Sequence, residues 1–439
     1  MVKFFSMKLL PAVLLAAFSG AVCASGFQLM EQNASGIGNA YAGSAAVADN
    51  ASTIFFNPAG MTQLQAREVS GGISLVNPSF HFKDKGSSNL GNLGNAGDGG
   101  NAGGWAAIPN GYLSWALNKD IYVGVGFGAP FGLTTEYNDR WVGGAHSVKF
   151  DVKTYNINPS VAWRVSDKVS LGAGLNWQRV EAEYVRLATV GGGAPAVFGD
   201  RVTSTMNLSD DSWGWNVGAL FTLSPSTKVG VSYRSQVKYD TSGKVKLSSD
   251  GTAAGNATLN GFIAQGRQSD VRADLTLPDT AILSVTQKLS DKWEMLGDVS
   301  WTGWSSIPKV DIMRSSGILN GQNAQTLDTN FRDTWRVALG ANYKYSDAWK
   351  LKYGVAYDQT PVKNKYDRLV SLPDNDRVWF SFGAQWTPDK SQRLDLGVTY
   401  IHVRDSEIDN DQSTFARGRV TGEYTGNIWI LGAQYSVAF

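Results

Sequence analysis

The feature that most constrains the fold is an alternation of apolar and polar residues that recurs from about residue 68 to the C-terminus. From Trp429 to Phe439, large apolar residues at odd positions alternate with mostly small or polar residues. The segments 155–164, 335–344 and 349–357 repeat this pattern. A period of two is the period of a β-strand, whose side chains point to opposite faces in turn. The alternation therefore predicts an all-β protein.

A soluble β-sandwich and a membrane barrel could both use such strands. Here Trp and Tyr stand at the ends of the apolar faces, as in the aromatic girdles of outer-membrane barrels. A sheet in a bilayer must also close, because no water is present to pair a free edge. After the first 25 positions, the sequence has no run of about 20 apolar residues that would form a spanning helix. These observations favour a closed transmembrane β-barrel.

The connections between the alternating segments have two lengths. Short turns are expected at 118–120, 166–168, 224–226, 290–291, 346–347 and 387–389, and longer stretches rich in Gly, Asn and Ser at 86–104, 188–211 and 241–270. Outer-membrane barrels have short turns on one side and long loops on the other. Counting strands between these connections predicts about 14 antiparallel strands. Pro159 interrupts one strand, since proline lacks the N–H that donates to the neighbouring strand, so a bulge or local break is expected there.

The N-terminal residues 1–24 are typical of an export signal. Lys3 and Lys8 precede a short apolar run at 9–18, and Val22, Cys23 and Ala24 provide small residues before a cleavage point. Val22 is a poor neighbour for a lipid-modified Cys23, which favours removal of both residues with the signal. The mature chain is then expected to begin near residue 25.

Composition excludes several classes of function. Lys and Arg number 39 and Asp and Glu number 38, so the overall charge does not support binding to nucleic acid. A single Cys excludes a disulfide framework and a Cys-based zinc site, and three scattered His residues argue against a His-rich metal centre. We therefore expect no metal, no cofactor and no nucleic-acid partner.

Residues 25–66 lack the alternation and are rich in Gly and Ala. The segment could be a disordered leader. However, Phe27, Ile54, Phe55, Phe56 and Met61 would be costly to leave in water. A barrel of about 14 strands would also enclose a wide aqueous hole. Both arguments favour a compact plug inside the lumen.

Three motifs in this segment resemble the opening of the FadL family of outer-membrane transporters for long-chain fatty acids and related hydrophobic compounds. They are Ser25-Gly26-Phe27-Gln28-Leu29, the run from Ser35 to Gly43, and Asn57-Pro58-Ala59-Gly60. The resemblance continues at 132–137, at 371–377 and in the final strand. It implies a hatch over residues 25–66, followed by a 14-stranded barrel over residues 67–439.

The resemblance also implies roles for particular residues. Phe27, Asn57, Pro58 and Ala59 match the hatch, where Pro58 fixes a turn and Asn57 can bond backbone or wall groups. The alternative is an ordinary Asn-Pro turn that starts a strand. The family's third strand carries an inward kink that opens the wall, and it matches Ala129-Pro130-Phe131-Gly132 here. Pro130, Phe131 and Gly132 are therefore expected to form a lateral opening, although a simple bulge would have the same sequence.

Carboxylate recognition is the last role that the resemblance implies. Gly172 and Gly174 precede Arg186 at the interval the family shows before its ligand-binding Arg, whose planar fork can bond both carboxylate oxygens. A lumen-facing Arg in an ordinary ion pair is the alternative. The family's second cation, on the ninth strand, is matched by Lys309 or Arg314, with Asp311 at the most direct position.

The resemblance thus implies passive, diffusional uptake of fatty acids, with hatch movement and lateral release into the outer membrane of a Gram-negative cell, by a monomer. Uptake of monoaromatic hydrocarbons by the same barrel is the alternative, for which Arg186 would be dispensable. An outer-membrane hydrolase is disfavoured because the sequence has no GxSxG elbow. An open porin is disfavoured by the hatch-like segment.

Overall fold

The computed structural model describes residues 26–88, 97–138, 140–188 and 202–439, and the predicted signal peptide lies outside them. The strands are β1 (Arg67–Asp84), β2 (Ala106–Ala116), β3 (Ile121–Gly128), β4 (Gly132–Glu136), β5 (Lys149–Ser166), β6 (Val169–Leu187), β7 (Val202–Ser224), β8 (Thr227–Arg234), β9 (Val237–Ser249), β10 (Ser269–Leu277), β11 (Thr280–Lys288), β12 (Trp293–Thr302), β13 (Val310–Arg314), β14 (Asn323–Leu327), β15 (Thr334–Lys344), β16 (Trp349–Asp358), β17 (Arg377–Asp389), β18 (Gln392–Asp411) and β19 (Arg419–Ala438). The helices are α2 (Thr53–Phe56) and α3 (Ala253–Ala264), with 3-10 turns η1 (Ile37–Asn39), η2 (Pro58–Gln63), η4 (Trp304–Ser306) and η5 (Ser413–Phe415).

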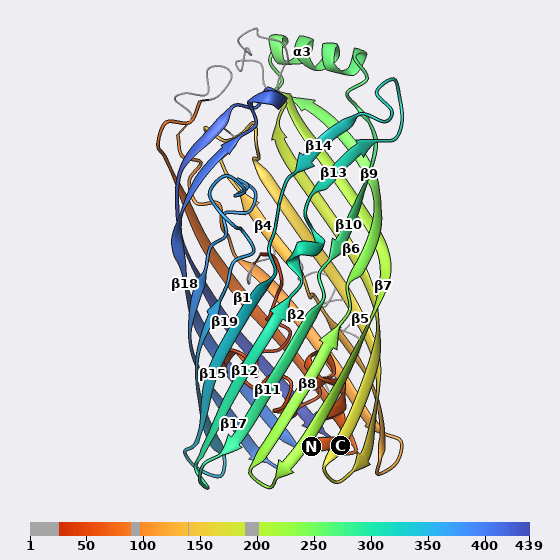
Figure 1. Ribbon diagram of the computed structural model, residues 1–439, viewed down its shortest axis with the longest axis vertical. Helices are drawn as coiled ribbons and strands as arrows, with labels where there is room; N and C mark the ends of the chain where they lie inside the picture. Colours follow the sequence, from red (N-terminus) through yellow and green to blue (C-terminus); the bar gives the residue numbers. More distant parts are fainter. Residues whose placement is uncertain (1–25, 89–96, 139, 189–201) are drawn as a thin grey trace, which may run out of the picture.

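These strands form one antiparallel barrel (Figure 1). It closes because β1 pairs with both β2 and β19. Over the described residues, the 19 strands make 14 spans, since five spans are divided into the pairs β3/β4, β8/β9, β10/β11, β12/β13 and β14/β15. The predicted closed 14-stranded barrel is confirmed. In the same residues, no helix has the length and apolar character to span a membrane.

The alternation separates an outer face from a lumenal face. On β19, Trp429 and Leu431 are 47% and 43% exposed, while Ile430 and Gln434 are 1% exposed. The large apolar side chains therefore point outward, which is the arrangement for a wall surrounded by lipid. The even-numbered residues of β19 point into the lumen and pack against residues inside the barrel.

The local break expected at Pro159 is present in the pairing of β5 with β6, without a shift of register. The pairing skips Asn158 and Pro159, between Ile157 opposite Trp177 and Ser160 opposite Gly174. The side-chain amide of Asn158 donates to the carbonyl oxygen of Leu175 at 2.7 Å. This side chain supplies a donor at the point where proline has none.

The N-terminal segment, residues 26–66, lies inside the barrel and contains no strand (Figure 1). Its hydrogen bonds reach the wall on several sides. They join Ala34 to Gln434 on β19, Asn39 to the carbonyls of Ala341 and Tyr353 on β15 and β16, Ser44 to Asp298 on β12, and Asn57 to the carbonyl of Ala219 on β7. Contacts with so many strands show that the segment fills the lumen as a folded unit.

Glycines on the lumenal face allow this segment to approach the wall closely. A Cβ built on Gly354 of β16 would lie 2.1 Å from the carbonyl carbon of Asn39, and one on Gly230 of β8 would lie 1.9 Å from the carbonyl oxygen of Ala45. No side chain can occupy either position without displacing the backbone of the segment. These glycines therefore fix where the N-terminal segment docks.

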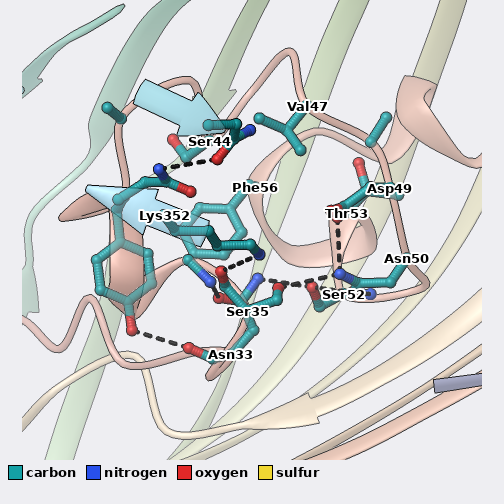
Figure 2. Close-up of a pocket in the computed structure, with 16 residues that line it drawn as sticks. Asn33, Ser35, Ser44, Val47, Asp49, Asn50, Ser52, Thr53, Phe56 and Lys352 are labelled. Carbon is teal, nitrogen blue, oxygen red and sulfur yellow. Dashed lines mark hydrogen bonds between the residues drawn. The ribbon is translucent and has the colours of Figure 1, made fainter. Parts of the chain in front are cut away.

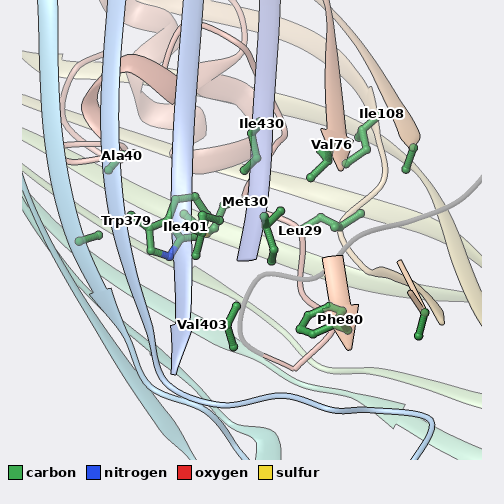
Figure 3. Close-up of a cluster of buried hydrophobic side chains, with 14 of the residues drawn as sticks. Leu29, Met30, Ala40, Val76, Phe80, Ile108, Trp379, Ile401, Val403 and Ile430 are labelled. Carbon is green, nitrogen blue, oxygen red and sulfur yellow. The ribbon is translucent and has the colours of Figure 1, made fainter. Parts of the chain in front are cut away.

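A hydrophobic cluster continues from this segment into the wall (Figure 3). Leu29 and Met30 belong to the same buried cluster as Trp379, Ile401 and Ile430, which come from β17, β18 and β19. The apolar residues of the segment thus bury themselves against inward-facing residues of the barrel, as expected for side chains that would be costly in water.

Candidate functional site

An apolar cavity of about 80 Å³ lies in the half of the barrel that carries the long loops. Strands β5, β6, β7, β9, β10, β13 and β14 line it, together with the segments 329–331 and 369–372. Its side chains are almost all aliphatic or aromatic and include Phe27, Phe150, Val152, Val180, Tyr184, Met206, Leu208, Ile312, Leu327, Phe331 and Leu372. For comparison, a cavity that holds benzene in a protein core measures about 150 Å³. The cavity here is smaller, so a molecule of the size of benzene or larger enters it only if a lining group moves.

Phe27 is the lining residue that comes from the N-terminal segment. Its ring meets Trp304 and Phe131 at edge-on angles, with centroid distances of 4.9 and 6.0 Å. We call residues 26–32 the tip and residues 33–64 the body of the N-terminal segment. Because Phe27 sits at the end of the tip, a displacement of the tip would enlarge the cavity.

The tip also covers the interruption in the third span, between β3 and β4. The amide of Leu29 donates to the carbonyl of Pro130 at 2.8 Å, and the amide of Gly132 donates to the carbonyl of Phe27 at 2.8 Å. Gln32 donates through its side chain to the carbonyl of Ala129 at 2.6 Å. Interrupting a strand leaves backbone groups that need partners. In this structure the tip supplies those partners.

Asp374 holds the first residue of the tip, next to Phe27. One carboxylate oxygen accepts hydrogen bonds from the amide of Gly26 at 3.0 Å and from the hydroxyl of Thr360 at 2.7 Å. The other oxygen pairs with Arg377, whose side chain is fully buried. Residues 371–372 line the cavity beside Asp374, so the same loop contacts both the tip and the ligand space.

Arginines follow the cavity toward the long loops. Arg186 comes two residues after Tyr184 on β6, and Arg314 comes two residues after Ile312 on β13. Because side chains two apart share a strand face, both lie on the lumenal face just beyond the apolar lining. Arg186 donates to Gln325 at 3.1 Å and is near enough to Arg314, Arg267 and Arg417 for their charges to act on it.

The charges of Arg186, Arg314 and Arg417 are not balanced by carboxylates within the described residues. Arg186, Arg314 and Arg417 have no Asp or Glu oxygen within 4.0 Å there, and their hydrogen bonds go to neutral groups. Arg417 lies in the loop after η5, where burial lowers its pKa. Partly buried cations without an anionic partner are costly, and a bound anion would reduce that cost.

Residues 15–439 match the model of a family described as "Outer membrane protein transport protein (OMPP1/FadL/TodX)". The chain belongs to the FadL family. Proteins of this family are transporters rather than enzymes, and this one is an outer-membrane protein whose long loops face the outside of the cell.

Individual relatives agree with this assignment. The chain is 29% identical over 463 residues to the "Long-chain fatty acid transport protein" of Escherichia coli K12, covering 98% of this chain and 97% of the relative. The crystal structure of a Pseudomonas aeruginosa FadL homologue superposes with a TM-score of 0.86 at 23% identity, covering 94% of this chain and 99% of the other. The Ralstonia pickettii toluene transporter TbuX gives a TM-score of 0.64 at 16% identity, with coverages of 93% and 100%.

The residues predicted for the hatch lie in the N-terminal segment inside the barrel. Asn57 is fully buried, accepts from the amide of Ala59 at 3.1 Å and donates to the carbonyls of Ala45 and Ala219 at 2.7 and 3.0 Å. Pro58 opens the 3-10 turn η2 and does not start a strand. Beside it, the body has a polar interior in which Lys352, Ser35, Asn50 and Ser52 are linked by hydrogen bonds (Figure 2).

The structure brings most, but not all, of the residues predicted for the lateral opening and for carboxylate binding to the interruption or to the cavity. Pro130 and Phe131 lie in the interruption and Gly132 begins β4. Arg314 lies near Arg186, but Lys309 pairs with Asp311 at 2.7 Å, is 52% exposed and does not line the cavity. In the described ranges, no three His, Cys, Asp or Glu side chains are grouped so that they could hold a metal ion.

Sequence reasoning missed Arg417 and the contact made by Asp374. Asp374 lies inside a family-like motif at 371–377, so the motif could have drawn attention to it. Arg417 lies in an irregular loop without periodicity, and no local signal indicates that it approaches Arg186.

Proposed function

We propose that this FadL-family protein carries long-chain fatty acids across the outer membrane by passive diffusion. The observation that carries this proposal is the group of arginines without carboxylate partners at the mouth of an apolar cavity. An apolar cavity suits an acyl chain, and a guanidinium forms paired, charge-assisted hydrogen bonds with a carboxylate. Arg186, Arg314 and Arg417 would bind the head group of the ligand while the cavity takes the chain.

Entry of the chain requires the tip to move. Each buried methylene contributes about 0.8 kcal/mol, so burial of a long acyl chain offsets the cost of displacing Phe27, Leu29 and Met30 and breaking the hydrogen bonds of the tip. The ligand then favours the state in which the tip has left, because only that state offers the larger cavity. Ligand binding and tip release are thus coupled.

We propose that the interruption at Ala129, Pro130 and Phe131 is the exit. On the side of β4 away from β5, no strand pairing exists among the described residues, and the tip occupies the interruption instead. When the tip leaves, the wall between β2 and β4 is open. An apolar ligand can then pass sideways into the bilayer without entering water.

Uptake and binding of labelled oleate and labelled toluene by wild type, Arg186→Ala and Lys309→Ala tests the proposal. Loss of a charged hydrogen-bonding partner costs about 1.5–3 kcal/mol, so we expect Arg186→Ala to weaken oleate binding about 10- to 100-fold. Lys309→Ala is the matched control, because Lys309 is exposed and paired with Asp311. Oleate binding that is equal in all three proteins contradicts carboxylate recognition.

Uptake of monoaromatic hydrocarbons is the second candidate. The aromatic rings of Phe27, Phe150, Tyr184 and Phe331 around a small cavity favour it. Toluene has no carboxylate, so its uptake should be indifferent to Arg186→Ala. Saturable toluene uptake together with no oleate uptake would move the assignment to hydrocarbons, and uptake of neither compound would reject both candidates.

A further inference from the structure

A second pocket, polar and of about 430 Å³, lies on the outer face of the wall. Four neighbouring strands, β5, β6, β7 and β9, form it, and the volume falls within the usual range of about 300–1,000 Å³ for ligand sites. On β6, Val180 and Tyr184 line the internal cavity, whereas Glu181 and Glu183 line this pocket. The alternation of side chains along a strand therefore places it outside the lumen.

The register of the strands fixes the height of this pocket relative to the membrane. Trp177 of β6 lies opposite Trp213 of β7, which is 63% exposed on the outer face. Exposed aromatic residues of a barrel mark the interface between lipid and water. Glu181, opposite Ser209, is four residues further toward the extracellular loops, or about 13 Å along the strand. The pocket thus faces the layer in which the head groups of the outer leaflet lie.

The lining carries groups of several kinds rather than one sign of charge. The carboxylates of Asp151, Glu181 and Glu183 can accept hydrogen bonds, and each already pairs with a cation, Lys153, Arg179 and Lys149 respectively. The side chains of Asn207, Ser209 and Ser242 can both donate and accept, as sugar hydroxyls require. Two ammonium groups remain available beside them. Within the described residues, Lys246 has no carboxylate within 4.0 Å, and Lys244 is only at 4.0 Å from Asp270.

This combination fits a sugar that carries phosphate. Lysine binds phosphate as a point charge, and mixed amide, hydroxyl and carboxylate groups satisfy the remaining hydroxyls. A basic group near a membrane surface also favours anionic lipid head groups. Phospholipid head groups without a sugar would leave most of the hydrogen-bonding side chains of the pocket unused.

We propose that this outer pocket binds the phosphorylated sugar head group of lipopolysaccharide in the outer leaflet, with Lys244 and Lys246 contacting phosphate and Glu181, Asn207 and Ser209 contacting the sugar. The site is separate from the transport route, because the wall itself divides it from the internal cavity. A lipopolysaccharide bound there would fix the position of β5, β6, β7 and β9 relative to the outer leaflet.

Native mass spectrometry of the detergent-purified full chain with diphosphorylated lipid A tests the proposal. We expect Lys244→Gln combined with Lys246→Gln to weaken lipid A binding at least tenfold. Lys119→Gln combined with Lys292→Gln is the matched control, since both lysines are exposed in short turns at the opposite end of the barrel. This control should bind lipid A as the wild type does.

Two further arms separate the proposed site from general attraction between charges. Ser209→Trp fills the pocket but keeps both lysines, and it should also lose lipid A binding. Phosphatidylglycerol, an anionic lipid without a sugar phosphate, should bind all variants equally and weakly. Lipid A binding that survives both pocket variants, or phosphatidylglycerol binding as strong as lipid A binding, overturns the proposal. Retained heat-modifiable migration on gels shows that each variant is folded.

Discussion

The tip and the body of the N-terminal segment are held to the barrel in different ways. The body, residues 33–64, forms hydrogen bonds with strands around the wall and packs against glycines whose positions leave no room for a side chain. Its Ser35 carbonyl also accepts a hydrogen bond at 2.8 Å from Lys352, which is buried and paired with Asp395 at 2.7 Å. The tip, residues 26–32, has hydrogen bonds to one interrupted span, to the carboxylate of Asp374 and to two strands through Gln28, and it packs through Phe27, Leu29 and Met30. From this difference we propose that the tip leaves while the body stays.

This division suits a transporter of hydrophobic molecules. A body that stays in place keeps polar solutes from crossing the barrel. A tip that leaves opens the cavity and the interruption of the third span together, since it contacts both. The predictions below test each half of this division, starting with the largest expected effect.

Gly354→Val should displace the body. The new Cβ would lie 2.1 Å from the backbone of Asn39, a contact that no side-chain rotation relieves. We expect a barrel with an open lumen, which planar-bilayer recording would detect as a severalfold rise in ion conductance. Gly71→Val is the matched control, because a Cβ at Gly71 of β1 meets no atom within 4 Å. Equal conductance of the two variants would show that the body is not fixed by close contact.

Asp374→Ala should release the tip and leave the body in place. Removing one partner of a buried ion pair costs about 3–5 kcal/mol, and the amide of Gly26 loses its acceptor as well. Hydrogen–deuterium exchange should then increase at the amides of the tip and remain slow in the body. The exposed Asp347→Ala serves as the control. Faster exchange throughout residues 26–64 would mean that tip and body move as one unit.

The sequence predicted well those parts that depend on neighbouring residues. Alternation is local, so it identified the strands and the outward apolar face. Pro130 and Gly132 indicated the interrupted span for the same reason. At Pro159 the same local reasoning predicted the break in the pairing of β5 with β6, where the side chain of Asn158 supplies the donor that proline lacks.

The parts that the sequence did not reveal depend on residues far apart in the chain. The bond between Gly26 and Asp374 joins residues separated by 348 positions. Arg417 approaches Arg186 from an irregular loop, and no periodicity predicts where such a loop folds. Lumenal glycines also look like any small residue in the alternation, although they determine where the body docks.

Gln32→Met should weaken the tip more gently. The side-chain amide of Gln32 donates to the carbonyls of Leu29 and Ala129 at 3.0 and 2.6 Å. Loss of such a hydrogen bond costs about 1 kcal/mol net. We expect severalfold faster exchange at the amide of Leu29 with no change in ion conductance. Gln65→Met is the control, since its side chain bonds to Lys390 at the exposed end of the barrel. Unchanged exchange at Leu29 would mean that Gln32 does not hold the tip.

Mild acid should loosen the extracellular mouth without releasing the tip. His146 lies in the loop between β4 and β5, where its ring bonds to the carbonyl of Gly418 at 3.0 Å, and burial lowers its pKa from 6.5 to about 4. A histidine kept neutral in the folded loop stabilises that loop above pH 6.5. This contribution falls as the pH drops toward 4, because the unfolded loop takes up the proton first. At pH 5.5 the loss is about 1 kcal/mol.

Hydrogen–deuterium exchange should therefore increase at residues 140–148 below pH 6.5 while residues 26–32 stay protected, and His146→Gln should remove the pH dependence. If the tip exchanged in parallel with the loop, the mouth and the tip would form one coupled gate, and the separation between a fixed body and a releasable tip would have to include the extracellular loop.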